Sequence, residues 1–114
     1  MTDNRTTPLD GITLLAPWEH TTARLHEVLE REVAPGHPLF GISTRALARH
    51  CDNDDVLFAL TDAPSSFAVV HLTWKGAPDS APNYPSAEYY RSLEEWITLR
   101  MTPDHAEYEA EDGD

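Results

Sequence analysis

The chain has 114 residues, of which 40% are hydrophobic, and its 20 acidic and 8 basic residues give a formal net charge of −12. This length suffices for one domain with its own core, and the single cysteine, Cys51, excludes an internal disulfide. The charge disfavours binding to nucleic acid or an anionic membrane and favours a basic partner. There is no apolar run of membrane-spanning length and no signal-peptide core, so we expect a cytoplasmic, bacterial-type protein.

The first half of the sequence predicts one helix. Residues 1–10 are expected to be disordered or loosely attached, and a single α+β domain is expected over residues 11–110. Pro17 can open a helix because proline is tolerated in the first turn. A helical spacing then relates the apolar residues Trp18, Leu25, Val28, Leu29 and Val33. Pro35-Gly36 ends this predicted N-terminal helix.

Three strands are predicted in the centre of the chain. The runs from Val56 to Leu60 and from Phe67 to Trp74 are rich in β-branched and aromatic residues, and a turn at residues 62–66 joins them. The first run is apolar on both faces, which indicates a central strand. Residues 42–50 are interpreted as a third strand that completes a workable sheet, with a helix as the alternative.

The last third of the sequence predicts a loop and a helix. Residues 75–87 contain three prolines and no hydrophobic periodicity, which is typical of a long loop. Ser92 and Glu95 form a capping box for a second helix, and residues 111–114 are expected to be an acidic, frayed tail. The predicted fold is therefore α+β: an N-terminal helix, a three-stranded antiparallel meander, a long Pro-rich loop and a C-terminal helix packed on the sheet.

Signatures of catalysis or metal binding are absent from the sequence, which contains no phosphate-binding loop, nucleophile elbow or paired-cysteine site. Acidic neighbours would raise the pKa of the Cys51 thiol and make it a poor nucleophile. None of the six histidines forms a helical ligand pair, so no metal or cofactor is predicted. His37, His50 and His71 could meet only through the tertiary fold.

The aromatic residues near the Pro-rich loop have two interpretations. Trp74 and Trp96 are predicted to be core residues. Tyr84, Tyr89 and Tyr90 could either pin the loop to the core or form a binding patch, because tyrosine commonly serves both roles.

Four sequence blocks carry a resemblance. They are Gly36 to Gly41 (GHPLFG), Asp54 to Leu60 (DDVLFAL), Ala68 to Trp74 (AVVHLTW) and the C-terminal SLEEW and RMTPDHAEY. Together they resemble a group of small acidic bacterial proteins of uncharacterised function. The resemblance spans roughly residues 36–108 and implies only that His37, His71 and Trp74 belong to recurring blocks.

Two functional hypotheses follow from the sequence. The first is a non-enzymatic binding protein of the immunity, inhibitor or regulator type, which engages a basic protein partner; we expect its acidic surface at Asp52, Asp54 and Asp55 and its aromatic contacts at Tyr84, Tyr89 and Tyr90. The alternative is a small enzyme or ligand-binding domain with a polar pocket around His37, His71 and Thr73.

Overall fold

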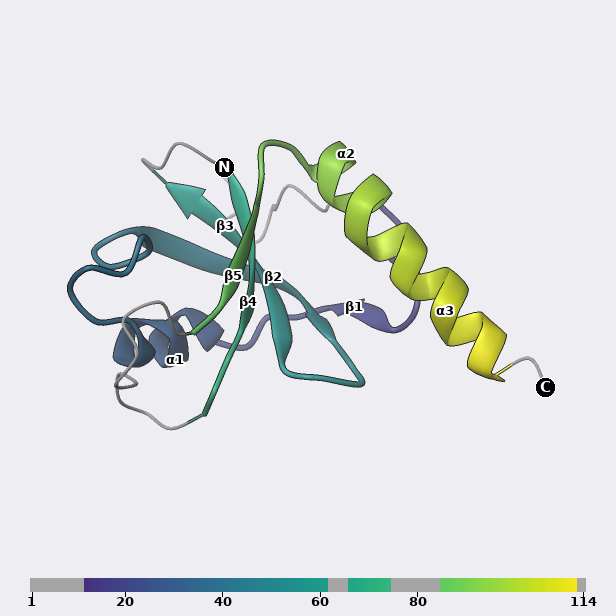
Figure 1. Cartoon of the computed structure of the whole chain (residues 1–114), viewed down its shortest axis with the longest axis horizontal. Helices are drawn as coiled ribbons and strands as arrows, with labels where there is room; N and C mark the ends of the chain where they lie inside the picture. The colour runs from purple at the N-terminus through teal and green to yellow at the C-terminus, as the bar shows by residue number, and fades with distance from the viewer. Residues whose placement is uncertain (1–11, 62–65, 75–84, 113–114) are drawn as a thin grey trace, which may run out of the picture.

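A five-stranded antiparallel sheet forms the centre of the molecule, with its strands in the order β1-β2-β3-β4-β5 (Figure 1). The computed structural model describes residues 12–61, 66–74 and 85–112. The five strands are β1 (Trp18–His20), β2 (Ser43–His50), β3 (Asp55–Thr61), β4 (Phe67–His71) and β5 (Ala87–Tyr90). The protein is α+β, but the prediction of a three-stranded meander with an N-terminal helix is wrong.

The predicted N-terminal helix is replaced by a short strand and a short helix. Trp18 pairs with His50 in the ladder between β1 and β2 and is buried there. The helix, α1 (Leu25–Glu32), begins only after the threonine pair at residues 21 and 22. The helical spacing from Trp18 to Leu25 was therefore a coincidence, because strand pairing with a distant part of the chain determines the conformation of Trp18.

The first two central strands fall where the sequence predicted them, and β4 begins at Phe67 as predicted but ends at His71 instead of Trp74. Residues 42–50 form a strand and not the alternative helix, and β3 occupies the centre of the sheet. The register between β2 and β3 shifts between Ala46 and Ala48, which marks a β-bulge. The added β5 follows the predicted loop and pairs antiparallel with β4, with Val69 opposite Glu88.

The C-terminal helix is continuous, although it contains a proline. It consists of α2 (Leu93–Trp96), a π-helical turn (Ile97–Met101) and α3 (Thr102–Asp112). Ser92 caps it by accepting a hydrogen bond from the Glu95 N–H at 3.0 Å, as predicted. The π-helical turn lies directly before Pro103, where an α-helix would lose one hydrogen bond and the proline ring would clash with the preceding turn.

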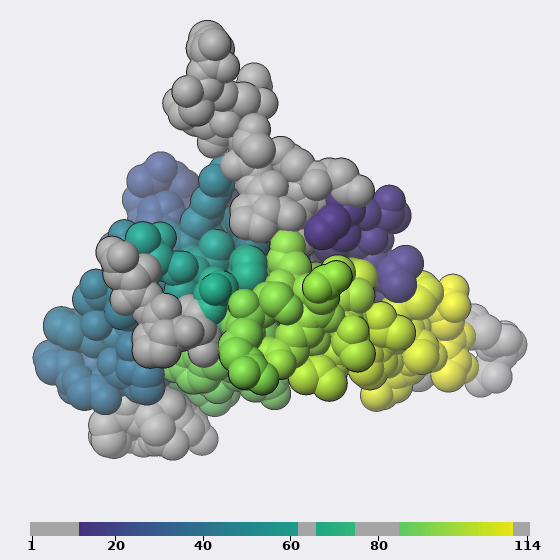
Figure 2. All heavy atoms as spheres, turned by 90° about the horizontal axis from the view of Figure 1, so that it is seen from above, coloured from purple at the N-terminus to yellow at the C-terminus, as the bar shows by residue number. Residues whose placement is uncertain are grey.

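Two hydrophobic clusters occupy the two faces of the sheet. α1 covers one face, where its Leu29 packs with β3 and β4 residues such as Phe58 and Val70. The C-terminal helix covers the other face, where Trp96 packs against Trp18 with a ring-centroid separation of 5.1 Å. The space-filling view shows the N-terminal segment, in purple, against the C-terminal helix, in yellow (Figure 2).

Trp96 is completely buried, as predicted, but Trp74 is 51% exposed. β4 ends at His71, so the alternation that was expected to direct Trp74 into the core does not reach it. The predicted loose segment, residues 1–10, lies outside the described residues, as do residues 113 and 114 of the predicted tail.

Candidate functional site

The acidic turn between β2 and β3 displays two of its three aspartates. Asp52 and Asp54 are exposed, whereas Asp55 is only 8% exposed and is the first residue of β3. Two side chains fix the turn: His50 Nδ1 accepts from the Asp52 N–H at 3.1 Å, and Asn53 Oδ1 accepts from the Asp55 N–H at 2.8 Å. The turn is therefore a structured acidic projection that can attract a cationic group.

Asp55 instead faces the C-terminal helix, where it has two partners. One carboxylate oxygen lies 2.7 Å from His71 Nδ1, and the other accepts a hydrogen bond from Arg100. Burial alone would raise the pKa of Asp55, but its bonds to Arg100 and His71, with their charges, hold it below its ordinary value. Asp55 is thus a structural anion rather than part of the exposed acidic surface.

Arg100 is the hub of this polar network. Its guanidinium also donates to Asp104 at 2.8 Å and to Glu88 at 3.0 Å, so it joins β3, β5 and α3. Burial disfavours its charge, but the carboxylates outweigh burial and raise the pKa of Arg100 above its ordinary value. Asp104 accepts a further bond from the Trp18 indole N–H at 2.9 Å. The network therefore attaches the C-terminal helix to the sheet.

A polar hollow of about 300 Å³ opens beside this network. It is lined by Asp55, Val69, His71, Ser86, Ala87, Glu88 and Arg100. The His71 side chain is 53% exposed and has its Nδ1 turned to Asp55. An imidazole that is oriented by a carboxylate and open to solvent can exchange protons with a bound molecule.

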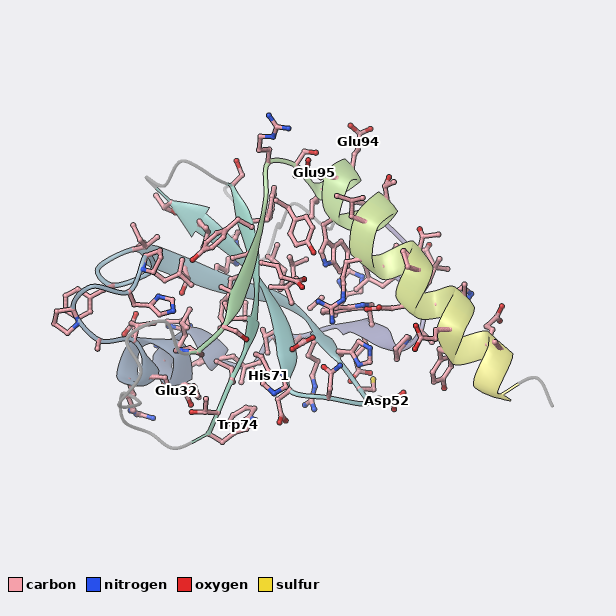
Figure 3. The ribbon with its side chains drawn as sticks, in the orientation of Figure 1. Glu32, Asp52, His71, Trp74, Glu94 and Glu95 are labelled. Atoms are coloured by element: carbon pink, nitrogen blue, oxygen red, sulfur yellow. The ribbon has the colours of Figure 1, made fainter. Side chains whose placement is uncertain are left out.

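A second feature lies toward the α1 side, where Glu32 holds the backbone at the end of β4. The Glu32 side chain is buried, and its two oxygens accept from the backbone N–H groups of Thr73 at 2.8 Å and Trp74 at 2.6 Å. Trp74 has φ = 62°, a left-handed conformation that is costly for any residue with a β-carbon. Figure 3 shows Glu32 and Trp74 side by side at the edge of the molecule.

Trp74 and the acidic turn are neighbours. Together with Leu25, Arg49 and Val56 they line a small hollow of about 20 Å³, to which Asn53, Asp54 and Asp55 contribute from the turn. The Leu72 N–H also donates to the Asp54 carbonyl at 3.1 Å, which ties the approach to Trp74 to this turn. The half-exposed Trp74 indole thus lies beside the exposed Asp54 carboxylate, with the exposed Arg49 in the same hollow; we name the surface formed by Asp54 and Trp74 the tryptophan–aspartate surface.

The other predicted site residues have varied positions. His37 is 5% exposed; its Nε2 donates to the Pro85 carbonyl at 2.8 Å and its Nδ1 accepts from the Leu39 N–H at 3.0 Å. Both ring nitrogens therefore serve the backbone, and the hollow that His71 lines does not include His37 in its lining. Thr73 takes part through its backbone bond to Glu32.

The tyrosines of the predicted binding patch differ in their exposure to solvent. Tyr89 is 40% exposed, but Tyr90 is 6% exposed and its hydroxyl donates to Glu88 at 2.9 Å. Burial and the neighbouring Glu88 raise the pKa of Tyr90 to about 12. Tyr84 lies outside the described residues.

Within residues 12–61, 66–74 and 85–112, no group of three or more histidine, cysteine, aspartate or glutamate side chains is arranged to hold a metal ion. Partial burial and the Glu19 carboxylate raise the pKa of the exposed Cys51 thiol. Among the described helices, none combines the length and the apolar character that crossing a membrane would require.

No known relative emerges from comparison with other proteins. No protein-family model, curated protein or solved structure matches this chain significantly.

Sequence reasoning did not identify Glu32, Arg100 or the exposure of Trp74. One signal for Glu32 was present: it ends α1, and a carboxylate at a helix C-terminus faces the unfavourable end of the macrodipole. Such a residue needs another partner, here two backbone N–H groups beyond β4. For Arg100 the partner Asp55 lies 45 residues away, and local periodicity contains no information on that contact.

Proposed function

We propose that this chain is a small acidic binding protein of the immunity, inhibitor or regulator type, which engages a basic protein partner through the tryptophan–aspartate surface. The observation that carries the proposal is the exposed position of the Trp74 side chain on a backbone of positive φ. A buried glutamate holds its backbone in a costly conformation, and the indole is half exposed beside the acidic turn. Costly backbone conformations of this kind concentrate at functional positions.

The chemistry of this surface suits a cationic partner. Tryptophan is the aromatic residue with the strongest attraction for a lysine or arginine cation, and it is frequent among residues that dominate binding energy. Asp54 offers direct charge pairing beside the indole, and the exposed Asp52 adds negative charge from the same turn. The net charge of −12 adds steering at long range, which raises the association rate.

The alternative pocket around His37, His71 and Thr73 receives less support from the geometry. His37 is occupied at both ring nitrogens by backbone groups, and Thr73 belongs to the Glu32 contact. Of these three residues, His71 alone lines the hollow of about 300 Å³.

The test begins with capture of partners from the native host on immobilised wild-type protein. The same capture is repeated with Trp74→Ala and with the Leu99→Ala control, which removes another exposed hydrophobic side chain from the C-terminal helix. A specific basic partner should be retained by wild type and Leu99→Ala and lost by Trp74→Ala. A partner retained equally by all three proteins would contradict the proposal.

Binding kinetics with the purified partner then distinguish electrostatic steering, which affects the on-rate, from the direct contact of Trp74, which affects the off-rate. The double variant Asp52→Asn, Asp54→Asn should lower the on-rate, and the wild-type on-rate should fall as salt rises. Trp74→Ala should mainly raise the off-rate. Asp55 is left unchanged in this experiment because its carboxylate holds Arg100. An on-rate that is indifferent to both salt and the double variant would contradict the steering argument.

A further inference from the structure

Three polar residues form a row on the face of the sheet that the C-terminal helix covers: Asp55 in β3, His71 in β4 and Ser86, which directly precedes β5. Asp55 on β3 is the register partner of His71 on β4. Val70 pairs with Ala87, and the His71 N–H donates to the Ser86 carbonyl at 3.0 Å, so Ser86 lies opposite His71 on the other side. Directly opposed side chains in an antiparallel pair share a face and have Cβ atoms roughly 4.5–5.5 Å apart.

The middle residue of the row is oriented as a general base requires. His71 Nδ1 lies 2.7 Å from Asp55 Oδ1. An ionised carboxylate can only accept, so Nδ1 carries a proton, and in the neutral form of the ring Nε2 is then the acceptor. Asp55 is itself held by Arg100, which fixes the carboxylate and keeps it charged. This is the relationship between a base and the residue that orients it in hydrolytic enzymes.

The hollow beside the row can admit a small substrate. It measures about 300 Å³ and contains Ser86, His71 and Asp55 together. Its charged rim consists of the Asp55 and Glu88 carboxylates and of Arg100, whose guanidinium is engaged by both of them. The excess of negative charge favours neutral or cationic molecules.

We propose that Ser86, His71 and Asp55 form an acyl-transfer site for small neutral or cationic esters, an activity separate from partner binding at the tryptophan–aspartate surface. Ser86 Oγ attacks the ester carbonyl while its proton passes to His71 Nε2. The bond to the leaving alcohol breaks, and the alcohol takes that proton. Water then attacks the acyl-serine, with His71 again accepting and returning a proton, and the products are a carboxylic acid and free Ser86.

The same negative surroundings predict that the reaction is slow, because they oppose the oxyanion of the tetrahedral intermediate. The sensitive measurement is therefore acylation of the protein rather than turnover. The probe is p-nitrophenyl acetate: nitrophenol release is followed by absorbance, and intact mass and peptide mapping locate the acetyl group. We expect one acetyl group on Ser86.

Substitutions test whether the row of Ser86, His71 and Asp55 causes the ester cleavage. Ser86→Ala and His71→Gln should each lower the protein-dependent rate of release by about 100-fold or more. Ser66→Ala and His20→Gln, which change an exposed serine and an exposed histidine elsewhere on the sheet, should react like wild type. Ser86→Cys keeps a nucleophile at the same position and should still be acetylated there, and far-UV circular dichroism establishes that each variant is folded.

Three results would overturn the proposal. The first is an acetyl group found only at Cys51, Lys75 or the amino terminus. The second is an undiminished rate in folded Ser86→Ala. The third is an equal loss in His20→Gln, which would indicate ordinary catalysis by exposed imidazole. None of these results bears on the proposed partner binding, because Trp74 and Asp54 are unchanged throughout.

Discussion

The carboxylate of Glu32 accepts a hydrogen bond from the backbone N–H of Trp74 at 2.6 Å, across 42 positions of sequence. With the bond to the Thr73 N–H, it satisfies two backbone donors that lie just beyond the end of β4. The contact therefore does two things: it closes α1 onto the sheet and it sets the direction of an exposed indole.

Replacing Glu32 by glutamine tests this contact. The amide keeps the shape of the side chain but presents an NH₂ group to one of the two backbone donors, so a partly buried donor loses its acceptor. We expect Glu32→Gln to lower the free energy of unfolding by roughly 1–3 kcal/mol, measured by urea denaturation. Glu30→Gln, which changes an exposed glutamate of the same helix, is the control and should have little effect. Equal stability of Glu32→Gln and wild type would show that the two hydrogen bonds contribute nothing net.

The two tryptophans should respond differently to truncation. Trp96 is fully buried, and Trp96→Ala should cost about 3–5 kcal/mol. Trp74 is half exposed, and Trp74→Ala should cost no more than roughly 1 kcal/mol, as is usual for a surface substitution. Thermal or urea melts of both variants measure this difference.

The left-handed backbone of Trp74 gives a second variant at the same position. Glycine adopts positive φ without steric cost, whereas alanine keeps the β-carbon that causes the clash. Trp74→Gly should therefore be at least as stable as Trp74→Ala, although glycine is normally the more destabilising replacement. A Trp74→Gly protein that melts clearly below Trp74→Ala would contradict the strained conformation.

The Asp55 network should make stability depend on acid pH. Its folded-state pKa lies below the unfolded value of about 3.9, so its contribution is present above that pH and is lost as the pH falls through the folded-state pKa. Arg100→Gln should remove the main cause of the lowered pKa and flatten this part of the curve of stability against pH. At neutral pH it should also cost roughly 1–3 kcal/mol, because carboxylates lose their partner.

Urea denaturation at a series of pH values measures both effects. Arg91→Gln is the matched control, since the Arg91 side chain is 85% exposed and its pairing with Glu95 is long, at 3.8 Å. Parallel pH curves for wild type and Arg100→Gln would mean that Arg100 does not set the pKa of Asp55.

The helix cap provides a smaller, local prediction. Ser92→Ala removes the acceptor for the Glu95 N–H and should lower the free energy of unfolding by about 1 kcal/mol. Thr98→Ala, on an exposed position of the same helix, changes a hydroxyl that is not a cap and should leave stability unchanged or slightly higher. Equal losses in both variants would indicate a general effect of alanine in this helix and not the loss of a cap.

Features with a local cause were predictable from the sequence. The apolar run of β3 predicted a central strand, and the Ser92 cap predicted the start of the C-terminal helix, because both patterns act within a few residues. β1 and β5 were missed for the opposite reason. They are short, and Trp18 and Glu88 are in strands because β2 and β4 lie beside them. No pattern within such a segment distinguishes it from a loop or a helix.

The candidate site also contains residues whose exposure was predictable from the local sequence and residues whose environment is set by distant contacts. Asp52 and Asp54 were predicted to be exposed from turn chemistry, and they are. Asp55 was placed with them by adjacency, but its environment is determined by Arg100 from the other end of the domain. Trp74 was assigned to the core because the alternation of buried and exposed residues in β4 was assumed to continue past His71. The strand ends at His71, and the Glu32 side chain binds the backbone that follows; no local pattern in the sequence predicts that contact.

The attachment of residues 15–18 to the C-terminal helix has a kinetic consequence. Three contacts hold it: Leu15 N–H to Met101 sulfur, the Trp18 indole to Asp104, and His105 Nδ1 to the Ala16 carbonyl, each joining residues 86 to 89 positions apart. Closing so long a loop is entropically slow, whereas β2, β3 and β4 are joined by short connections. The central hairpins are therefore expected to form the folding nucleus, and the two flanking segments to dock afterwards. Weakening the Trp18–Asp104 contact should then accelerate unfolding while leaving the refolding rate almost unchanged.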